Sequence, residues 1–360
     1  MSERRRSVYV AIDTGVDPVA YGEAYRRDEV PDALPYGLHQ LADHDFDLRF
    51  LPPRRPGLLT RIVAEAGRRA TLDLNPWSLA EAAASRRAAD VVLAWEERVG
   101  LPVALARRLG EPPCVTGVIW MTDRHDQVPE PYRRVVRAAL ARAAGVFVLS
   151  SAQVEPLTDQ WGVAAEVVHH VPFGIPVEQW ASHAGVDQEE ALVVAAGNDW
   201  DRDHHLLVGA VREVNRKGVG LRLELLTERD IDVEPGLGVR RQAAGLADIR
   251  RVYGRASFVT VATRPNLHAS GMTVALEAMA SGRAVIASAT PGMEDYVVDG
   301  ETGFLVRPGD RHALAERMQL LVGDPDLAGR LGAAGREKVR REHSSSRMAD
   351  DLARLLRAAA

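Results

Sequence analysis

The segment from Arg264 to Asp310 carries residue types that could bind an anion and a polyol. Its loop, His268-Ala269-Ser270-Gly271, runs directly into an apolar-periodic helix that we expect to begin at about Met272. The first turn of such a helix offers unpaired backbone N–H groups and the positive end of a helix dipole, here at Gly271, Met272 and Thr273. A phosphate group binds well in that position.

Glu277 is the only charge in the run MTVALEAMA, which forms the body of this helix. The apolar residues Val274, Leu276 and Met279 around it predict that the helix is largely buried. A carboxylate in such a setting needs a hydrogen-bonding or ionic partner.

Composition limits the classes of protein to which the chain can belong. Its 360 residues, 46% of them hydrophobic, are enough for two core-forming domains. The net charge of -5 gives no reason to propose nucleic acid or an anionic membrane as a partner. One cysteine, Cys114, excludes an internal disulfide framework and fits a reducing compartment. No run approaches the ~20 apolar residues that span a bilayer, so we expect a soluble, cytoplasmic protein without membrane insertion.

Short apolar runs alternate with longer helical patterns along the whole chain. One series of runs covers residues 8–12, 47–50, 91–94, 115–120, 146–149 and 167–171, and a second covers 192–196, 221–226, 259–262, 284–287 and 304–306. The alternation predicts an α/β protein with two doubly wound, Rossmann-like domains. Because ligands in such sheets bind beyond the carboxyl ends of the strands, we expect the two domains to face each other across a cleft.

Three segments resemble a known family: LEAMASGRAVIAS, DGETGFLVRPGD and ARAAGVFVLSSAQVEPLTDQWG. They are similar to the bacterial retaining glycosyltransferases of the GT-B type, specifically family 4, the glycosyl transferases of group 1. The resemblance implies an acceptor-binding domain over residues 1–180 and a nucleotide-sugar-binding domain over residues 181–345. It also implies that a terminal helix over residues 346–360 packs back on the first domain.

The family pattern has two glutamates eight positions apart, and Glu277 matches the second. That match implies hydrogen bonds from Glu277 to the ribose hydroxyls of a nucleotide. The first glutamate is missing, because its position holds Ala269. We therefore expect His268, Ser270 and the backbone at the start of the helix (Gly271, Met272 and Thr273) to place the donor sugar. His268 could instead be a structural hydrogen bonder.

A second departure follows the first strand of the predicted C-terminal domain. The family commonly has Gly-Arg there and a further cation a few residues later, whereas this chain has Gly197-Asn198 and then Arg202. An arginine can bind two phosphate oxygens at once, so we expect Arg202 and Asn198 on the donor side. The alternative is that Arg202 only bridges the aspartates beside it.

Candidate residues of the first domain lie after its strand-like runs. In Thr122-Asp123-Arg124-His125-Asp126, either Asp123 or His125 matches the position where the family presents a group to the donor sugar and the acceptor. Both could equally be capping or surface residues. Glu96 follows another run, and Gly15 lies in a long connection; these two are possible acceptor or lid residues.

The resemblance implies transfer of a hexose-type sugar from a nucleotide diphosphate sugar to an acceptor hydroxyl, with retention of configuration. The sequence shows no His/Asp/Glu cluster with metal-site spacing, so we expect no metal and no cofactor besides the co-substrate. No basic amphipathic surface helix stands out, which favours a soluble small-molecule acceptor, such as a natural-product scaffold. A monomer or a homodimer fits equally well.

Two other functions remain open. A nucleotide-sugar epimerase shares this architecture but needs several acid/base groups around the sugar. A non-catalytic nucleotide-sugar-binding protein is the other alternative, and Ala269 motivates both.

Overall fold

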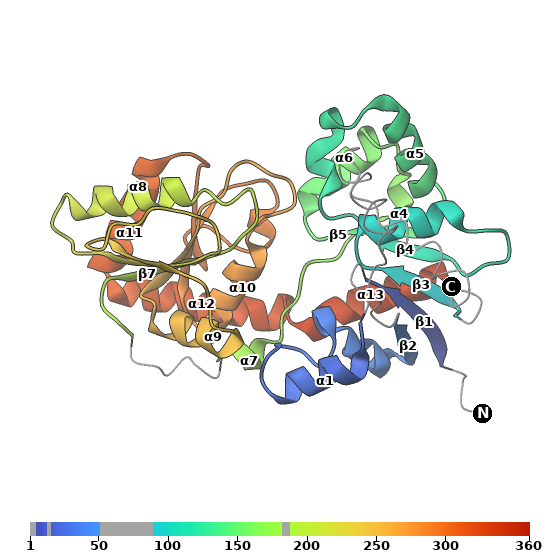
Figure 1. Ribbon diagram of the computed structural model, residues 1–360, viewed down its shortest axis with the longest axis horizontal. Helices are drawn as coiled ribbons and strands as arrows, with labels where there is room; N and C mark the ends of the chain where they lie inside the picture. The colour runs from blue at the N-terminus through green and yellow to red at the C-terminus, as the bar shows by residue number, and fades with distance from the viewer. Residues whose placement is uncertain (1–4, 13–15, 51–88, 182–187) are drawn as a thin grey trace. The chain divides into compact units, whose positions relative to one another are not determined.

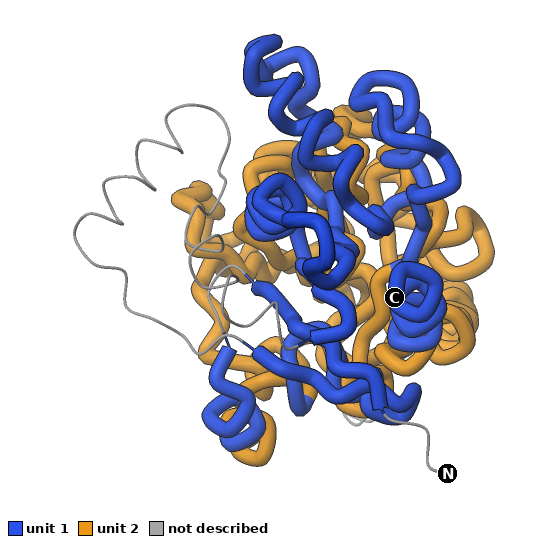
Figure 2. Tube along the Cα trace, turned by 90° about the vertical axis from the view of Figure 1, so that its right-hand side faces the viewer, with its two compact units in different colours: residues 1–23, 33–172, 348–360 blue, residues 24–32, 173–347 orange. Residues whose placement is uncertain are grey.

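The computed structural model describes residues 5–12, 16–50, 89–181 and 188–360. The chain divides into two compact units (Figure 2): unit 1 has residues 1–23, 33–172 and 348–360, and unit 2 has residues 24–32 and 173–347. The division after residue 172 comes earlier than the predicted boundary after residue 180. Residues 24–32 belong to unit 2 although they precede most of unit 1 in the chain, which the sequence pattern did not indicate.

Unit 1 is built on a parallel sheet with the strand order β2-β1-β3-β4-β5-β6. Its strands are β1 (Arg6–Ala11), β2 (Phe46–Phe50), β3 (Val91–Ala94), β4 (Cys114–Gly117), β5 (Gly145–Val148) and β6 (Val168–His170). The three central strands β3, β4 and β5 are buried along their whole length, as continuous apolar strands of a sheet covered on both faces are.

Helical segments cover this sheet (Figure 1). They are η1 (Pro35–His44), α4 (Glu97–Ala106), η3 (Met121–Gln127), α5 (Glu130–Leu140), η4 (Ser151–Gln153), α6 (Val154–Asp159), η5 (Ala165–Val167) and α13 (Ser345–Ala359). Helix α1 (Pro18–Arg26) has no buried residue and ends in the segment 24–32 of unit 2. Leu140 of α5 and Leu157 of α6 share one core cluster with β5. In α13, Leu355 lies in the space that the missing side chain of Gly145 leaves, and Asp350 pairs with His44 at 3.0 Å. The end of the chain is therefore part of unit 1.

Unit 2 has a second parallel sheet, with the order β12-β11-β10-β7-β8-β9. Its strands are β7 (Leu192–Ala196), β8 (Arg222–Leu226), β9 (Gly238–Arg241), β10 (Phe258–Val261), β11 (Ala284–Ser288) and β12 (Gly303–Val306). Numbered from the first strand of the unit, the order across the sheet is 3-2-1-4-5-6, which is the order of a dinucleotide-binding fold. The order reverses between β7 and β10.

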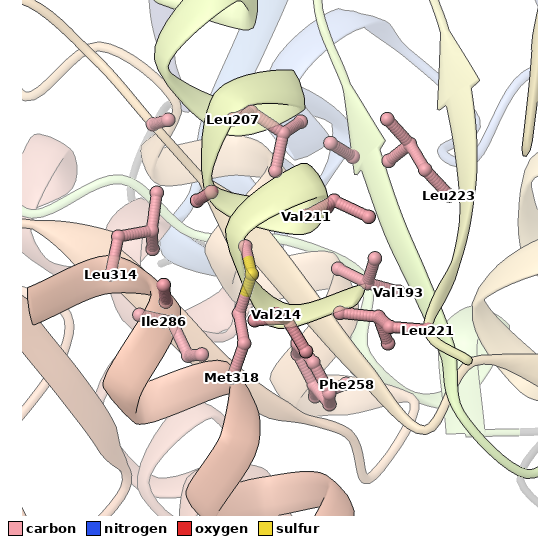
Figure 3. Close-up of a cluster of buried hydrophobic side chains, with 14 of the residues drawn as sticks. Val193, Leu207, Val211, Val214, Leu221, Leu223, Phe258, Ile286, Leu314 and Met318 are labelled. Atoms are coloured by element: carbon pink, nitrogen blue, oxygen red, sulfur yellow. The ribbon is translucent and has the colours of Figure 1, made fainter. Parts of the chain in front are cut away.

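The helices of unit 2 lie on both faces of its sheet (Figure 1). They are α7 (Val177–Ala181), α8 (His204–Asn215), α9 (Leu246–Arg255), α10 (Met272–Ala280), η6 (Met293–Asp295), α11 (Arg311–Gly323) and α12 (Pro325–Glu342). Figure 3 shows the core between the sheet and the pair α8 and α11, where Val211 and Met318 meet Phe258 and Ile286. Helices α10 and α12 pack together against β11 on the opposite face.

One strand of unit 2 was not predicted from the sequence. Strand β9 reads Gly-Val-Arg-Arg, and Val239 and Arg240 in it are exposed at the edge of the sheet. A short, charged edge strand lacks the apolar run by which the buried strands can be recognised. Among the described residues, no helix is both long enough and apolar enough to cross a membrane.

Candidate functional site

The loops that follow β7 and β10 meet where the strand order of unit 2 reverses. The backbone N–H of Asp203 donates to the carbonyl of Ala262 at 2.9 Å, and the N–H of Arg264 donates to the carbonyl of Asp201 at 2.7 Å. Ligands of open α/β sheets bind at such a reversal, beyond the carboxyl ends of the strands. The predicted donor-side residues therefore lie on the two loops that border this position.

The loop before α10 is held by its own side chains. Asn266 Oδ1 accepts the Ser270 N–H at 2.9 Å, and Asn266 Nδ2 donates to the Arg264 carbonyl at 2.8 Å. Gly271 is the N-cap of α10 with a φ of 89°, a left-handed conformation that favours glycine. Met272 begins the helix as predicted, and the turn carries no side-chain cap. The first-turn N–H groups are those that the sequence analysis assigned to an anion.

The side chain of Arg202 is buried between the loop after β7 and the loop before α10. The residue is 5% exposed, and a Cβ added at Gly197 or at Gly271 would overlap its guanidinium group. Both glycines have positive φ angles, 135° and 89°. The site therefore needs glycine at both positions for two reasons: the missing Cβ leaves room for Arg202, and glycine adopts a positive φ without strain. Arg202 is thus placed directly beside the N-terminus of α10.

Asp199 is a site residue that the sequence analysis missed. Its Oδ2 pairs with Arg202 Nε at 3.0 Å and accepts the Ser270 hydroxyl at 2.7 Å, while its Oδ1 accepts the Asp201 N–H at 2.8 Å. Burial alone would raise the pKa of Asp199, but Arg202 and these hydrogen bonds hold it below the ordinary value. Asp199 is therefore a carboxylate in the folded protein.

Asn198 turns away from this cluster toward the segment after β8. Its Oδ1 accepts the Thr227 hydroxyl at 3.0 Å and the Glu228 N–H at 2.8 Å. The side chain therefore fixes the loop after β7 to the loop after β8. Its predicted donor contact remains untested.

Glu277 lies one and a half turns into α10, with its carboxyl group near both Tyr253 and Arg202. The Tyr253 hydroxyl donates to Glu277 Oε2 at 3.3 Å. Burial raises the pKa of Glu277 to about 8, although Tyr253, Arg202 and Arg250 act in the opposite direction. The predicted need for a partner is met by Tyr253, a residue on α9 that sequence spacing does not connect with Glu277.

Asp199, Asp201 and His268 form a group whose ligand atoms lie within 4.8 Å of one another, close enough to hold a metal ion. Sequence spacing did not indicate this group, because the loop before α10 brings His268 next to residues far away in sequence. The expectation that no metal is needed stays a prediction. Two contacts already compensate these groups: Arg202 pairs with Asp199, and His268 Nε2 lies 3.7 Å from Asp201. A cation would compete with the guanidinium group for Asp199.

In unit 1, the corresponding reversal of strand order lies between β1 and β3. Gly15, the predicted lid residue after β1, lies outside the described residues. Glu96 follows β3 as predicted, as the partly exposed N-cap residue of α4, and no side-chain capping bond is formed. The buried ring of Trp95 beside it is stacked on Tyr36 at 3.9 Å.

Glu97, which directly follows the possible acceptor residue Glu96, fixes the loop after β4. Its two carboxylate oxygens accept the backbone N–H groups of Ile119, Trp120 and Met121, each at 2.8 Å. From the other side, Gln153 donates to the Ile119 carbonyl at 2.7 Å. The position of Glu97 shortly after a predicted strand could have drawn attention to it. Its partners could not be predicted, because they lie more than twenty residues away in the sequence.

Asp123 and His125 lie in η3, immediately beyond the segment that Glu97 holds. The His125 ring stands edge-on to Trp161 at 5.0 Å, and its Nδ1 lies 3.0 Å from Asp126 Oδ1. Asp123 is partly exposed. Both residues are thus close to the strand end at which they were predicted, and their catalytic assignment stays a prediction.

Helix α5 corrects one premise of the sequence analysis, since it is a basic amphipathic surface helix. It carries Arg133, Arg134 and Arg137 beside the exposed Tyr132, and Val136 and Leu140 point into the core. Glu130 pairs with all three arginines, the shortest distance being 2.9 Å to Arg133. A basic amphipathic surface helix is therefore present, contrary to the expectation, and α5 gives no support to a soluble acceptor.

The architecture of two parallel six-stranded sheets with covering helices is the predicted GT-B fold. It is similar to sucrose-phosphate synthase from Thermosynechococcus elongatus, with a TM-score of 0.73, 20% sequence identity and 98% of each chain covered. It is also similar to HepE from Anabaena in complex with UDP and glucose, with a TM-score of 0.68, 16% identity and 98% and 99% coverage.

Residues 190–324, most of unit 2, match the family model of the glycosyl transferases group 1. The capsular polysaccharide biosynthesis glycosyltransferase CapM of Staphylococcus aureus is 31% identical over 159 residues, 42% of each protein. Alpha-maltose-1-phosphate synthase of Mycobacterium tuberculosis is 29% identical over 244 residues, 59% of this chain and 62% of that protein. The matches thus cover less than two thirds of these relatives' length. The resemblance to the glycosyl transferases of group 1 that was stated from the sequence is confirmed.

Proposed function

We propose that the protein is a glycosyltransferase that takes a sugar from a nucleotide diphosphate sugar and transfers it to an acceptor hydroxyl with retention of configuration. The observation that carries the proposal is the site at the β7/β10 reversal in unit 2. There, a helix N-terminus without a side-chain cap, the buried Arg202 and the carboxyl group of Glu277 come together within the segment that matches the family.

Each part of this site fits a different part of the donor. The N–H groups of Gly271 and Thr273 at the start of α10 suit phosphate oxygens, since they lie at the positive end of a helix. The Met272 N–H already donates to the Ala269 carbonyl at 2.9 Å. Arg202 adds a guanidinium group beside them. Glu277 can accept hydroxyl groups of a ribose, a role that its match to the second family glutamate implies. The UDP and glucose bound to HepE support the same donor class.

The leaving nucleotide carries more negative charge than the bound donor, so groups placed in advance around the phosphates lower the barrier. The helix N-terminus and Arg202 would supply this stabilisation without a proton transfer. We propose that the reaction needs no metal ion, because Arg202 occupies the place beside the phosphates. Activity that EDTA abolishes and Mg²⁺ or Mn²⁺ restores would contradict that part of the proposal.

Asp123 or His125 would face the sugar and the acceptor in this proposal. We propose a small-molecule acceptor, a monomer or homodimer, and a cytoplasmic location, in line with the single cysteine. The basic surface of α5 leaves an acceptor with an anionic group as one class to include in acceptor panels.

The function can be tested in two steps. Thermal shift with UDP-, GDP-, ADP- and TDP-sugars identifies the donor, because a ligand of the folded state raises its apparent stability. The donor that binds is then incubated, with a radiolabel in the sugar, in the presence of acceptor panels. Transfer of the label with retained configuration is expected. An epimerised nucleotide sugar in the absence of acceptor would instead identify an epimerase, and binding without transfer to any acceptor would favour a non-catalytic protein.

The ribose contact has its own test. Glu277→Ala is expected to weaken nucleotide binding by ~1 to 3 kcal/mol, the cost of losing its hydrogen bonds to the ribose. Unchanged affinity in titration calorimetry would remove Glu277 from the site.

A further inference from the structure

The loop before α10 contacts a carboxylate that belongs to a different loop. Ala269, which stands where the family pattern has a glutamate, is fully buried with a φ of 49°. The hydroxyl of the next residue, Ser270, donates to Asp199 Oδ2 at 2.7 Å. Asp199 comes from the loop after β7, on the other side of the strand reversal. An acidic group is therefore present at this loop although the loop itself contains none.

Asp199 also fixes the position of the charged guanidinium group of Arg202. A buried guanidinium group needs a counter-charge, and Asp199 supplies one at 3.0 Å while Gly197 and Gly271 leave room for the arginine. Arg229 holds the backbone of the same turn by donating to the Asp199 carbonyl at 3.0 Å and to the Arg202 carbonyl at 3.3 Å. Asp199 and Arg202 are thus fixed to each other through both side chain and backbone.

The alternative partner of Arg202 is Glu277, which lies near enough to interact with it electrostatically. Without Asp199, the guanidinium group would be free to turn toward Glu277 and away from the start of α10. Ser270 would lose its acceptor at the same time. Both changes would disturb the part of the site to which we assign the diphosphate.

We propose that Asp199 is a positioning residue of the donor site, which holds Arg202 and Ser270 in place for the diphosphate and supplies the acidic group that position 269 lacks. This inference rests on the proposed function. It has an unusual consequence for electrostatics: a negative side chain increases the affinity for an anionic ligand, because it fixes the cation that binds the ligand.

The test compares two variants that lose the same charge from the same loop. Asp199→Asn removes the ion-pair partner of Arg202, whereas Asp201→Asn removes a carboxylate that lies 3.7 Å from His268 Nε2. Affinity for UDP, GDP, ADP and TDP is measured by titration calorimetry, and the nucleotide that the unchanged protein binds most tightly is used for both variants. We expect Asp199→Asn to weaken binding about tenfold or more, in the range of a hydrogen bond to a charged group. Asp201→Asn should leave binding unchanged or tighten it, since one repulsive charge is gone.

Two further variants separate positioning from folding. Asp199→Glu keeps the charge and should bind better than Asp199→Asn, whereas a purely steric role would make the larger side chain the worse one. Ser270→Ala should weaken binding less than Asp199→Asn, and it should add little in the Asp199→Asn background, because the two residues act through one contact. This milder variant also tests the proposal if Asp199→Asn does not fold.

The outcomes distinguish the inference from the function on which it rests. If the unchanged protein binds none of the four nucleotides, the proposed function fails. If it binds one of them and Asp199→Asn tightens binding as much as Asp201→Asn, Asp199 only repels the ligand and the inference is wrong.

Discussion

Glu97 in unit 1 and Asp199 in unit 2 each follow a parallel strand, and each carboxylate contacts three polar groups. Glu97 accepts hydrogen bonds from three backbone N–H groups. Asp199 accepts hydrogen bonds from one backbone N–H group and one hydroxyl group, and it forms an ion pair with a guanidinium group. The first arrangement fixes the course of the chain, whereas the second fixes functional side chains. The position after a strand therefore does not by itself tell whether an acidic residue is structural or belongs to a binding site.

The largest effect is expected for Glu97→Gln. A glutamine places an NH₂ group against at least one of the three N–H donors, so the free energy of unfolding should fall by about 3 kcal/mol, the upper range for a buried unsatisfied donor. Urea unfolding followed by tryptophan fluorescence measures the loss. The neighbouring, partly exposed Glu96 is the matched control, and Glu96→Gln should change stability by about 0.5 kcal/mol or less.

Nucleotide binding by the folded Glu97→Gln protein tests whether Glu97, unlike Asp199, has a purely structural role. We expect it to be unchanged, because the described contacts of Glu97 lie within unit 1. A tenfold loss of affinity would show that Glu97 also supports the donor site.

A smaller effect is expected for Gly271→Ala. The new Cβ would overlap Arg202 and Val261 at a φ of 89°, which should destabilise unit 2 by about 2 kcal/mol and weaken nucleotide binding. Gly218→Ala is the control, because Gly218 has a φ of 82° but no atom within 4 Å of its added Cβ. Equal losses of stability in the two variants, with normal nucleotide binding by Gly271→Ala, would mean that the space around the Arg202 guanidinium group accommodates a methyl group.

The smallest effect is expected in the pH dependence of stability. The pKa of Glu277 is raised from 4.5 to about 8 in the folded protein, so the folded state holds a proton that the unfolded chain releases. This contribution is complete below about pH 4.5 and is lost as the pH rises through about 8. Glu277→Gln should therefore flatten the fall in stability on the alkaline side.

Urea unfolding at several pH values measures this slope, and Glu301→Gln, at an exposed site, should keep the slope of the unchanged protein. If Glu277→Gln retains the full slope, another group is responsible for it. The ionised form of Glu277 is the better acceptor for ribose hydroxyls, so nucleotide affinity should rise over the same pH range.

Most of the fold could be predicted because its buried strands are continuous apolar runs. Val91–Ala94 was predicted with its observed bounds, and Leu192–Ala196 likewise. Strand β9 could not be predicted, since its charged edge residues carry no apolar pattern. The start of α10 was also predictable, because a glycine followed by an apolar helical period is a local signal.

The contacts within the site were not predictable in the same way. Asp199, Tyr253 and Gly271 reach Arg202 and Glu277 from separate loops and helices, and no spacing in the sequence relates them. The group Asp199, Asp201 and His268 was missed for this reason, since His268 joins the two aspartates only through the fold. Residue types could be recognised from the sequence, whereas their pairing depends on the strand order.

Residues 24–32 have a consequence for any attempt to divide this protein. Asp28 pairs with Arg250 at 2.5 Å, Gln179 donates to Tyr25 at 3.2 Å, and Ser345 donates to Asp32 at 3.1 Å. A fragment that begins at residue 173 would lose all three partners and leave Arg250 without its carboxylate. The two halves of this enzyme-like architecture therefore cannot be obtained by a single cut, and truncation or domain-exchange experiments would have to carry the short N-terminal segment along with the C-terminal half.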